Sequence, residues 1–378
     1  MKKSLAIAAA VAATFASASY AQSSVTLYGI VDAGITYTTN IASTDGNGNV
    51  VGNNRFGMTS GNLQASRWGL RGAEDLGGGL KAIFTLESGF DVTNGQQNGG
   101  LFNRQSYVGL TQDQYGTLTF GRQFDSVIDY VGPLTAVGTW GGTYMAHVMD
   151  NDNGNGTFSL NNAVKYTSPN LSGFQFGGAY AFSNQAGGFA NNRAYSAGMG
   201  YSNAGLRLGL AYLQAQGMNN NPTGGAVTSD QFGPRQRERV WGGGASYTWG
   251  PAVAGVVFTQ TRLYGLNDGY SLRYNNIEAN VHYNLTPALG LGAMYTYTNS
   301  NGSLLAAEGG GRTAHWNQFG LQADYSLSKR TDVYLEGVGV WGAGQAAVGM
   351  TEVGYTSTGG VSSSKNQGII TTGIRHRF

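Results

Sequence analysis

Cysteine is absent from this chain of 378 residues, which excludes disulfides, thiol catalysis and thiolate metal ligands together. Charged residues make up only 11% and are scattered, so the sequence offers no clustered basic surface for nucleic acid. Proline is rare, with 6 residues, which argues against a proline-rich disordered chain. After the first residues no apolar run is long enough for a membrane-spanning helix, so a helical membrane protein is excluded as well.

The first residues have the pattern of a secretory signal peptide. Lys2 and Lys3 precede a short apolar run from Leu5 to Phe15, and small residues surround Ala21. We expect cleavage after Ala21, so that residues 1–21 direct export and residues 22–378 form a single domain. Removal of the two lysines leaves 20 basic against 20 acidic residues, and the mature chain is formally neutral.

The rest of the chain consists largely of segments of about ten residues in which polar and apolar side chains alternate. In Leu80 to Phe90 the even positions from 80 to 86 are apolar, whereas Lys81 and Glu87 lie on the opposite face. A soluble sandwich also produces alternation. However, the apolar stripes end in aromatic residues, as an interfacial girdle in a membrane requires. These aromatic residues are Tyr166, Tyr180, Tyr201, Tyr247, Trp249, Tyr283 and Tyr325.

The alternating segments number about 16 and predict an all-β protein, a 16-stranded antiparallel transmembrane β-barrel. Short turns alternate with long loops rich in glycine, asparagine and serine, and we expect Thr39 to Asn62 to be one of these loops. The 62 glycines suit curved strands and polar loops. We expect strands to begin near Val25, Ser66, Leu80, Phe102, Gly116, Asn162, Phe174, Arg193, Leu206, Glu238, Ala252, Tyr274, Ala288, His315, Thr331 and Asn366.

Several motifs resemble those of the Gram-negative general porins of the betaproteobacterial type. They are SVTLYG from Ser24, SRWGLRG from Ser66, NRQSYVGL from Asn103, GTLTFGRQ from Gly116 and the final GIRHRF from Gly373. The resemblance covers nearly the whole mature chain.

The resemblance implies an outer-membrane homotrimer in which each barrel passively admits small hydrophilic solutes and ions through a water-filled pore. The third external loop would fold inward and narrow this pore. The expected partners are outer-membrane lipid, lipopolysaccharide and the barrel-insertion machinery, with the C-terminal aromatic residue Phe378 as the assembly signal. An ordinary last strand that pairs with the first would also explain the terminal segment.

The segment from Gln123 to Leu160 is the one long loop of mixed composition. The loop has many apolar side chains, such as Val127, Tyr130, Leu134 and Trp140, and exposing them all to solvent would be unfavourable. We therefore expect this loop to pack against the inner wall. A loop docked there would form the narrowest point of the pore. Its carboxylates are Asp125, Asp129, Asp150 and Asp152.

Basic residues are expected opposite the loop. Alternation places Arg67, Arg71 and Lys81 on the lumen face, and the resemblance points to Arg67 and Arg104. The strand of Arg104 has no cleanly polar face, and Arg122 shares the parity of the outward residues before it but ends its strand. We therefore predict a pore constriction of Arg67, Arg71, Lys81, Arg104, Arg122, Asp125 and Asp129.

A positive constriction favours anions, because charges count for more in a narrow, partly desolvated gap. Cation-preferring relatives carry acids beyond the midpoint of the inward loop, but Val137 to Gly142 contains none. The family often has a further arginine before the sixth strand, where this chain has Ser159 to Asn161. We expect weak to moderate anion preference. The alternative interpretation is that the arginines have no role in selectivity and are simply polar residues at water-facing positions of the barrel wall.

No cofactor, metal site or catalytic residue is expected. Asp150 to Gly156 has the opening of a calcium loop but lacks the glutamate that should stand at Asn161. Gly337 to Gly342 has dinucleotide-fingerprint spacing but lies in a strand pattern with no following helix. An outer-membrane barrel enzyme or an adhesin remains an alternative. The first would need a Ser/His or Asp/His grouping at the rim, and the second would need repeats and an extra exported domain.

Overall fold

The computed structural model describes residues 24–220, 224–228, 230, 232–266, 269–303, 313–344 and 360–378. The predicted signal peptide lies outside these residues. Within them, no helix is sufficiently long and apolar to traverse a bilayer.

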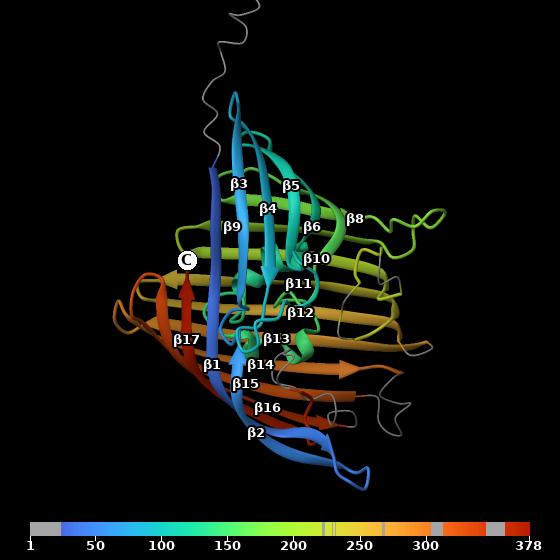
Figure 1. Cartoon of the computed structure of the whole chain (residues 1–378), viewed down its shortest axis with the longest axis vertical. Coiled ribbons are helices and arrows are strands. Elements are labelled where there is room, and N and C mark those ends of the chain that lie inside the picture. The colour runs from blue at the N-terminus through green and yellow to red at the C-terminus, as the bar shows by residue number, and fades with distance from the viewer. Residues whose placement is uncertain are drawn as a thin grey trace, which may run out of the picture.

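The described strands form one antiparallel sheet that closes on itself (Figure 1). The last strand pairs with the first, from Ile30 opposite Arg377 to Thr38 opposite Ile369. Since closure leaves no free edge, every strand can satisfy its backbone groups inside a bilayer. The strands are β1 (Ser24–Thr44), β2 (Val50–Ser60), β3 (Arg67–Gly77), β4 (Leu80–Gly89), β5 (Gln105–Gln112), β6 (Gly116–Gln123), β7 (Leu160–Thr167), β8 (Phe174–Ala181), β9 (Ala194–Asn203), β10 (Leu206–Met218), β11 (Arg235–Trp249), β12 (Ala252–Leu266), β13 (Tyr270–Asn284), β14 (Leu289–Asn301), β15 (Thr313–Ser326), β16 (Thr331–Gly344) and β17 (Asn366–Arg377).

Two of these segments are halves of one barrel strand. The first part of β1 pairs with β3, from Ser24 opposite Ala73, whereas its later part pairs with β2, from Ala33 opposite Ser60. β2 and β3 therefore make one strand interrupted at residues 61–66, and the barrel has 16 strands, as predicted.

The expectation of a loop from Thr39 to Asn62 is wrong, because β1 continues to Thr44 and β2 fills most of the segment. The segment is polar enough to look like a loop. Yet its inward face meets water and needs no apolar side chains, while Phe56 and Met58 face outward.

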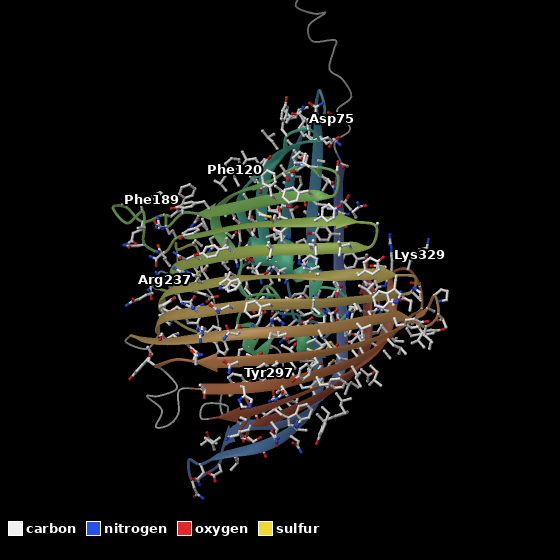
Figure 2. All side chains as sticks on the ribbon, turned by 180° about the vertical axis from the view of Figure 1, so that it is seen from behind. Asp75, Phe120, Phe189, Arg237, Tyr297 and Lys329 are labelled. Carbon is white, nitrogen blue, oxygen red and sulfur yellow. The ribbon has the colours of Figure 1, made fainter. Side chains whose placement is uncertain are left out.

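Apolar side chains cover the outside of the barrel. Leu27, Val108 and Ile277 are each more than half exposed, at 57%, 59% and 56%, and their neighbours in sequence point inward. Figure 2 shows Phe120 projecting from this outer surface. Near the turns the outer face ends in Tyr247, Trp249, Tyr283 and Tyr325, which form the predicted aromatic girdle at this end of the barrel.

Residues 124–159, which we call the inner loop, lie inside the barrel against the wall of β9 to β16 (Figure 1). The loop contains short helical turns, and its apolar side chains are buried between loop and wall, as predicted from its composition. The turns are η1 (Val127–Val131), η2 (Gly132–Leu134), η3 (Thr143–Met145) and η4 (Val148–Asp150).

Glycines on the inner wall give this loop its room. A Cβ at Gly198 would lie closer than 3 Å to the ring of Tyr130, and a Cβ at Gly292 would collide with Trp140 in the same way. Protein interiors are close-packed, so side chains at these positions would displace the loop. Glycine on this wall therefore provides space for the loop, in addition to the expected curvature of strands.

Replacing a docking glycine should loosen the inner loop. We expect Gly292→Val to lower stability by about 1–3 kcal/mol, because the added side chain overpacks the Trp140 contact. We also expect it to change single-channel conductance. Thermal unfolding and planar-bilayer recording would measure both effects. Trp140→Ala in the same chain should restore stability, and Gly57→Val, which enters open space, is the matched control. Equal effects at Gly57 and Gly292 would contradict this account of the glycines.

Candidate pore constriction

Two of the predicted arginines converge on a single buried carboxylate. Arg104 Nε lies 2.8 Å from Glu87 Oε1, and Arg67 Nε lies 3.8 Å from Glu87 Oε2. The hydroxyl of Tyr28 also donates to Glu87, at 3.0 Å. Both arginine side chains remain about one-fifth exposed, at 20% and 21%, whereas the carboxylate is 6% exposed. The two guanidinium groups therefore outnumber their acid and keep a net positive charge toward the lumen.

Arg122 joins this group through neutral partners. Its Nε donates to the backbone oxygen of Asn103 at 2.6 Å, and its Nη1 donates to the side chain of Asn161. Arg122 follows the outward Phe120 by two residues, but a register shift between Gly121 and Gln123 interrupts the alternation there. Its guanidinium group is positioned by neutral oxygen acceptors, and these hydrogen bonds involve no carboxylate.

A cavity of about 1000 Å³ lies between the inner loop and two of these arginines, Arg104 and Arg122. Arg104 and Arg122 line one side, and Phe124, Tyr144 and Thr157 of the inner loop line another. Arg104 lies over the ring of Phe124 at 5.5 Å. The cavity also reaches Asp91, whose side chain accepts hydrogen bonds from Thr93 and Asn94. Arg104, Arg122 and the docked loop thus border this cavity together.

Arg71 and Lys81 stand on the same inner face but further from the loop. Arg71 pairs with Thr26 and Thr85 across the sheet and lies over the ring of Tyr28 at 5.3 Å. Lys81 pairs with Asp75 next to the turn, six residues from Glu87 along β4, or roughly 20 Å. The structure does not bring Lys81 to the cavity.

The two loop carboxylates predicted at the constriction, Asp125 and Asp129, already have hydrogen-bond or ion-pair partners within the protein. Asp125 is fully buried and accepts hydrogen bonds from Asn153 and from the Val127 backbone, so it holds the loop together and does not face the cavity. Burial raises the pKa of Asp125 to about 6. Asp129 Oδ2 lies 2.5 Å from Lys165 Nζ. These acids therefore offset little of the positive charge around Arg104.

The far side of the loop is anchored by a buried histidine that the sequence gives no reason to single out. His147 Nδ1 lies 2.7 Å from Asp152 Oδ2, and His147 Nε2 lies 3.1 Å from Glu278 Oε2 on β13. Glu278 also accepts the backbone N–H of Ala136 at 2.7 Å. Burial alone would lower the pKa of His147, but the two carboxylates raise it well above its usual 6.5. Asp152, part of the calcium-like segment, serves this anchor.

Glu87 is the other residue that sequence reasoning leaves out. Alternation places it on the polar face of its strand, which was the available signal. Its position between Arg67 and Arg104 depends on the register of β3, β4 and β5, and the sequence does not specify that register.

The comparisons with known proteins agree with this architecture. Residues 8–338 match the family described as Gram-negative porin. The chain belongs to this family. It is therefore a porin, an outer-membrane channel, and neither the enzyme nor the adhesin alternative is favoured.

Relatives of this porin come from other Gram-negative bacteria. An outer membrane porin protein of Bordetella pertussis is 39% identical over 280 residues, covering 69% of this chain and 70% of that protein. Outer membrane porin protein 32 of Delftia acidovorans is 31% identical over the full length of both chains. Among solved structures, an anion-selective porin from Comamonas acidovorans has a TM-score of 0.73 and 25% identity, covering 94% of this porin and 100% of that chain.

The His147 anchor of this porin should weaken as pH rises. Since the pKa of His147 is raised in the folded protein, the charged bridge is complete below about pH 6.5 and is lost as pH passes the raised value. We expect open-channel current noise to increase from about pH 6 to pH 10 as the loop loosens. His147→Gln should remove this pH dependence. His315→Gln, on the outer face, is the control. Identical pH profiles for wild type and His147→Gln would exclude the anchor as the cause.

Proposed function

We propose that this porin prefers anions and that Arg67, Arg104 and Arg122 produce the preference. The observation that carries the proposal is that Arg104 and Arg122 line the cavity, while Arg67 shares the carboxylate of Glu87 with Arg104. The three arginines have one directly paired carboxylate, Glu87, and the nearby loop acid Asp125 is buried away from the passage. In a narrow passage near the protein surface, a net positive charge attracts anions more strongly than in open water. The solutes favoured would be small hydrophilic anions.

The relatives give further support. The solved structure from Comamonas acidovorans is described as an anion-selective porin. Two acids of the opposite wall are buried beneath the loop, where Glu336 accepts the Gly142 backbone N–H at 2.8 Å and Glu278 contacts His147.

Neutralising Arg104 should reduce the preference most. Arg104→Gln removes one positive charge and also leaves Glu87 with only the longer Arg67 contact. We expect the chloride-to-potassium permeability ratio to fall about fivefold, which corresponds to about 1 kcal/mol for one charge at contact distance in water. The reversal potential in a potassium chloride gradient measures this ratio.

Lys81→Gln is the matched control, because it removes the same charge from the same wall, roughly 20 Å along β4 from Glu87, and Lys81 does not line the cavity. Its effect should be much smaller. Cation preference in the wild type, or equal shifts in both variants, would reject the proposed role of the arginine group.

We further propose that the protein works as a homotrimer and that Phe378 promotes its insertion. A Vibrio cholerae outer membrane protein of related fold is described in a trimer form. Phe378 exchanges backbone hydrogen bonds with Gly29, both at 3.1 Å, and its ring covers this glycine on the outer face. The ring is 41% exposed, so it is accessible to a partner during assembly.

Deleting Phe378 should reduce the amount of SDS-resistant trimer in the outer membrane several-fold, because both the closing backbone pair and the exposed ring are lost. Heat-modifiable migration on SDS gels provides the measurement. Phe378→Ala keeps the backbone pair and removes only the ring, while Phe378→Tyr keeps both. If Phe378→Ala assembles like wild type and the deletion does not, strand closure alone explains the terminal residue.

A further inference from the structure

One strand of the barrel wall is interrupted at residues 61–66, between β2 and β3. We call these residues the strand break. Gly61 begins it with a φ of 74°, and a Cβ at this position would lie 2.9 Å from the Cα of Ala65, so glycine suits this turn. Backbone N–H groups that leave the sheet at such a point need other acceptors, because unpaired polar groups inside a membrane protein are costly.

Asp32 on β1 supplies the acceptors that the strand break needs. Its Oδ2 accepts the backbone N–H of Leu63 at 2.7 Å and that of Gln64 at 2.8 Å, and its backbone oxygen accepts the N–H of Gly61 at 2.8 Å. Asp32 is completely buried, and a buried carboxylate is costly unless hydrogen bonds satisfy it. This carboxylate therefore replaces the sheet partners that the strand break has lost.

The strand break presents two backbone carbonyls to the inner loop. Thr143 donates its backbone N–H to Asn62 O at 2.8 Å and its hydroxyl to Gly61 O at 2.9 Å. The hydroxyl of Tyr144 donates to Asn62 Oδ1 at 3.0 Å. In a regular strand the carbonyls point along the sheet toward neighbouring strands, so the interruption makes them available to the lumen. We call Thr143 and Tyr144 the loop tip.

Tyr334 on β16 connects Asp32 to this contact. Its hydroxyl donates to Asp32 Oδ1 at 2.6 Å and accepts from Asn62 Nδ2 at 3.0 Å. Gly34 on β1 leaves room for the amide, since a Cβ there would lie 2.5 Å from Asn62 Nδ2. A continuous path of buried hydrogen bonds thus runs from Asp32 through Tyr334 and Asn62 to Tyr144.

The strand break and the loop tip border the cavity of the pore constriction. Gly61 and Ser66 line this cavity together with Thr143 and Tyr144, and Arg104 lines it as well. A loop tip that leaves the strand break would therefore alter the width of the cavity beside the arginine.

We propose that the strand break is the docking site of the loop tip, and that Asp32 and Tyr334 are positioning residues that set the width of the pore. Neither residue lines the cavity, so each acts through Asn62 and the strand break. The proposal concerns width and not charge. It is therefore independent of the anion preference.

Liposome swelling with neutral sugars tests the proposal, because uncharged solutes report the width of the pore. Tyr144→Phe removes the hydroxyl that donates to Asn62, and Tyr334→Phe removes the hydroxyl between Asp32 and Asn62. The loss of one hydrogen bond should raise the ratio of released to docked loop tips about fivefold. We therefore expect raffinose to enter faster, relative to arabinose, through either variant than through the wild type.

Asp32→Asn tests the carboxylate itself. The amide keeps one oxygen for the N–H groups of the strand break but presents its NH2 group to Tyr334, which can no longer donate there. The raffinose-to-arabinose ratio should rise as it does in Tyr334→Phe. Tyr107→Phe is the matched control, because it removes a hydroxyl of the barrel wall whose partner is Thr85 and not the loop. Its sugar ratio should equal that of the wild type.

A double variant shows whether the two tyrosines act through one path. The combined effect of Tyr144→Phe and Tyr334→Phe should be smaller than the sum of the single effects, because both changes interrupt the same contact. Additive effects would overturn the proposal. A wild-type sugar ratio in Tyr334→Phe or in Asp32→Asn would also overturn it, even with a lower unfolding temperature, since a purely structural role predicts a loss of stability alone.

Discussion

Backbone hydrogen bonding in hydrocarbon is the constraint on which this structure depends. Hydrocarbon offers no hydrogen-bond partner to an exposed strand edge, so each N–H and C=O of the strands must be paired within the protein, and the sheet has to close. The closing contact between β1 and β17 extends to the last residue, where Phe378 and Gly29 exchange backbone hydrogen bonds. The broken strand of β2 and β3 obeys the same constraint, since β1 is long enough to pair with both halves.

Closure creates a lumen, and the inner loop narrows it. The loop is held by shape and by charge. Tyr130 and Trp140 occupy spaces left by wall glycines, and His147 joins the loop to Glu278 on the wall. Wall carboxylates that would otherwise face the passage accept hydrogen bonds from the loop. Docking therefore both reduces the cross-section and buries two wall carboxylates, Glu278 and Glu336, beneath the loop.

The arginines of this porin are in two settings with different physical consequences. Arg67 and Arg104 face water in the lumen and share Glu87, so their charge is partly offset and remains accessible to passing ions. Arg239 and Arg262 face the outside, where the described residues provide amide partners and no carboxylate. Composition does not distinguish the two groups. The barrel wall does, because each residue position along a strand has one side toward water and the other toward lipid.

The sequence by itself determined the barrel, the outward apolar face and most strand positions, because alternation is local and bilayer dimensions fix strand length. It also indicated that the inner loop packs against the inner wall, since its apolar side chains must be buried away from solvent. Only the tertiary structure decided that Thr39 to Asn62 is mostly strand, that Glu87 stands between two arginines and that Asp125 is buried. These outcomes depend on register and on loop docking, in which residues far apart in the chain become neighbours, and local patterns carry no information about such contacts.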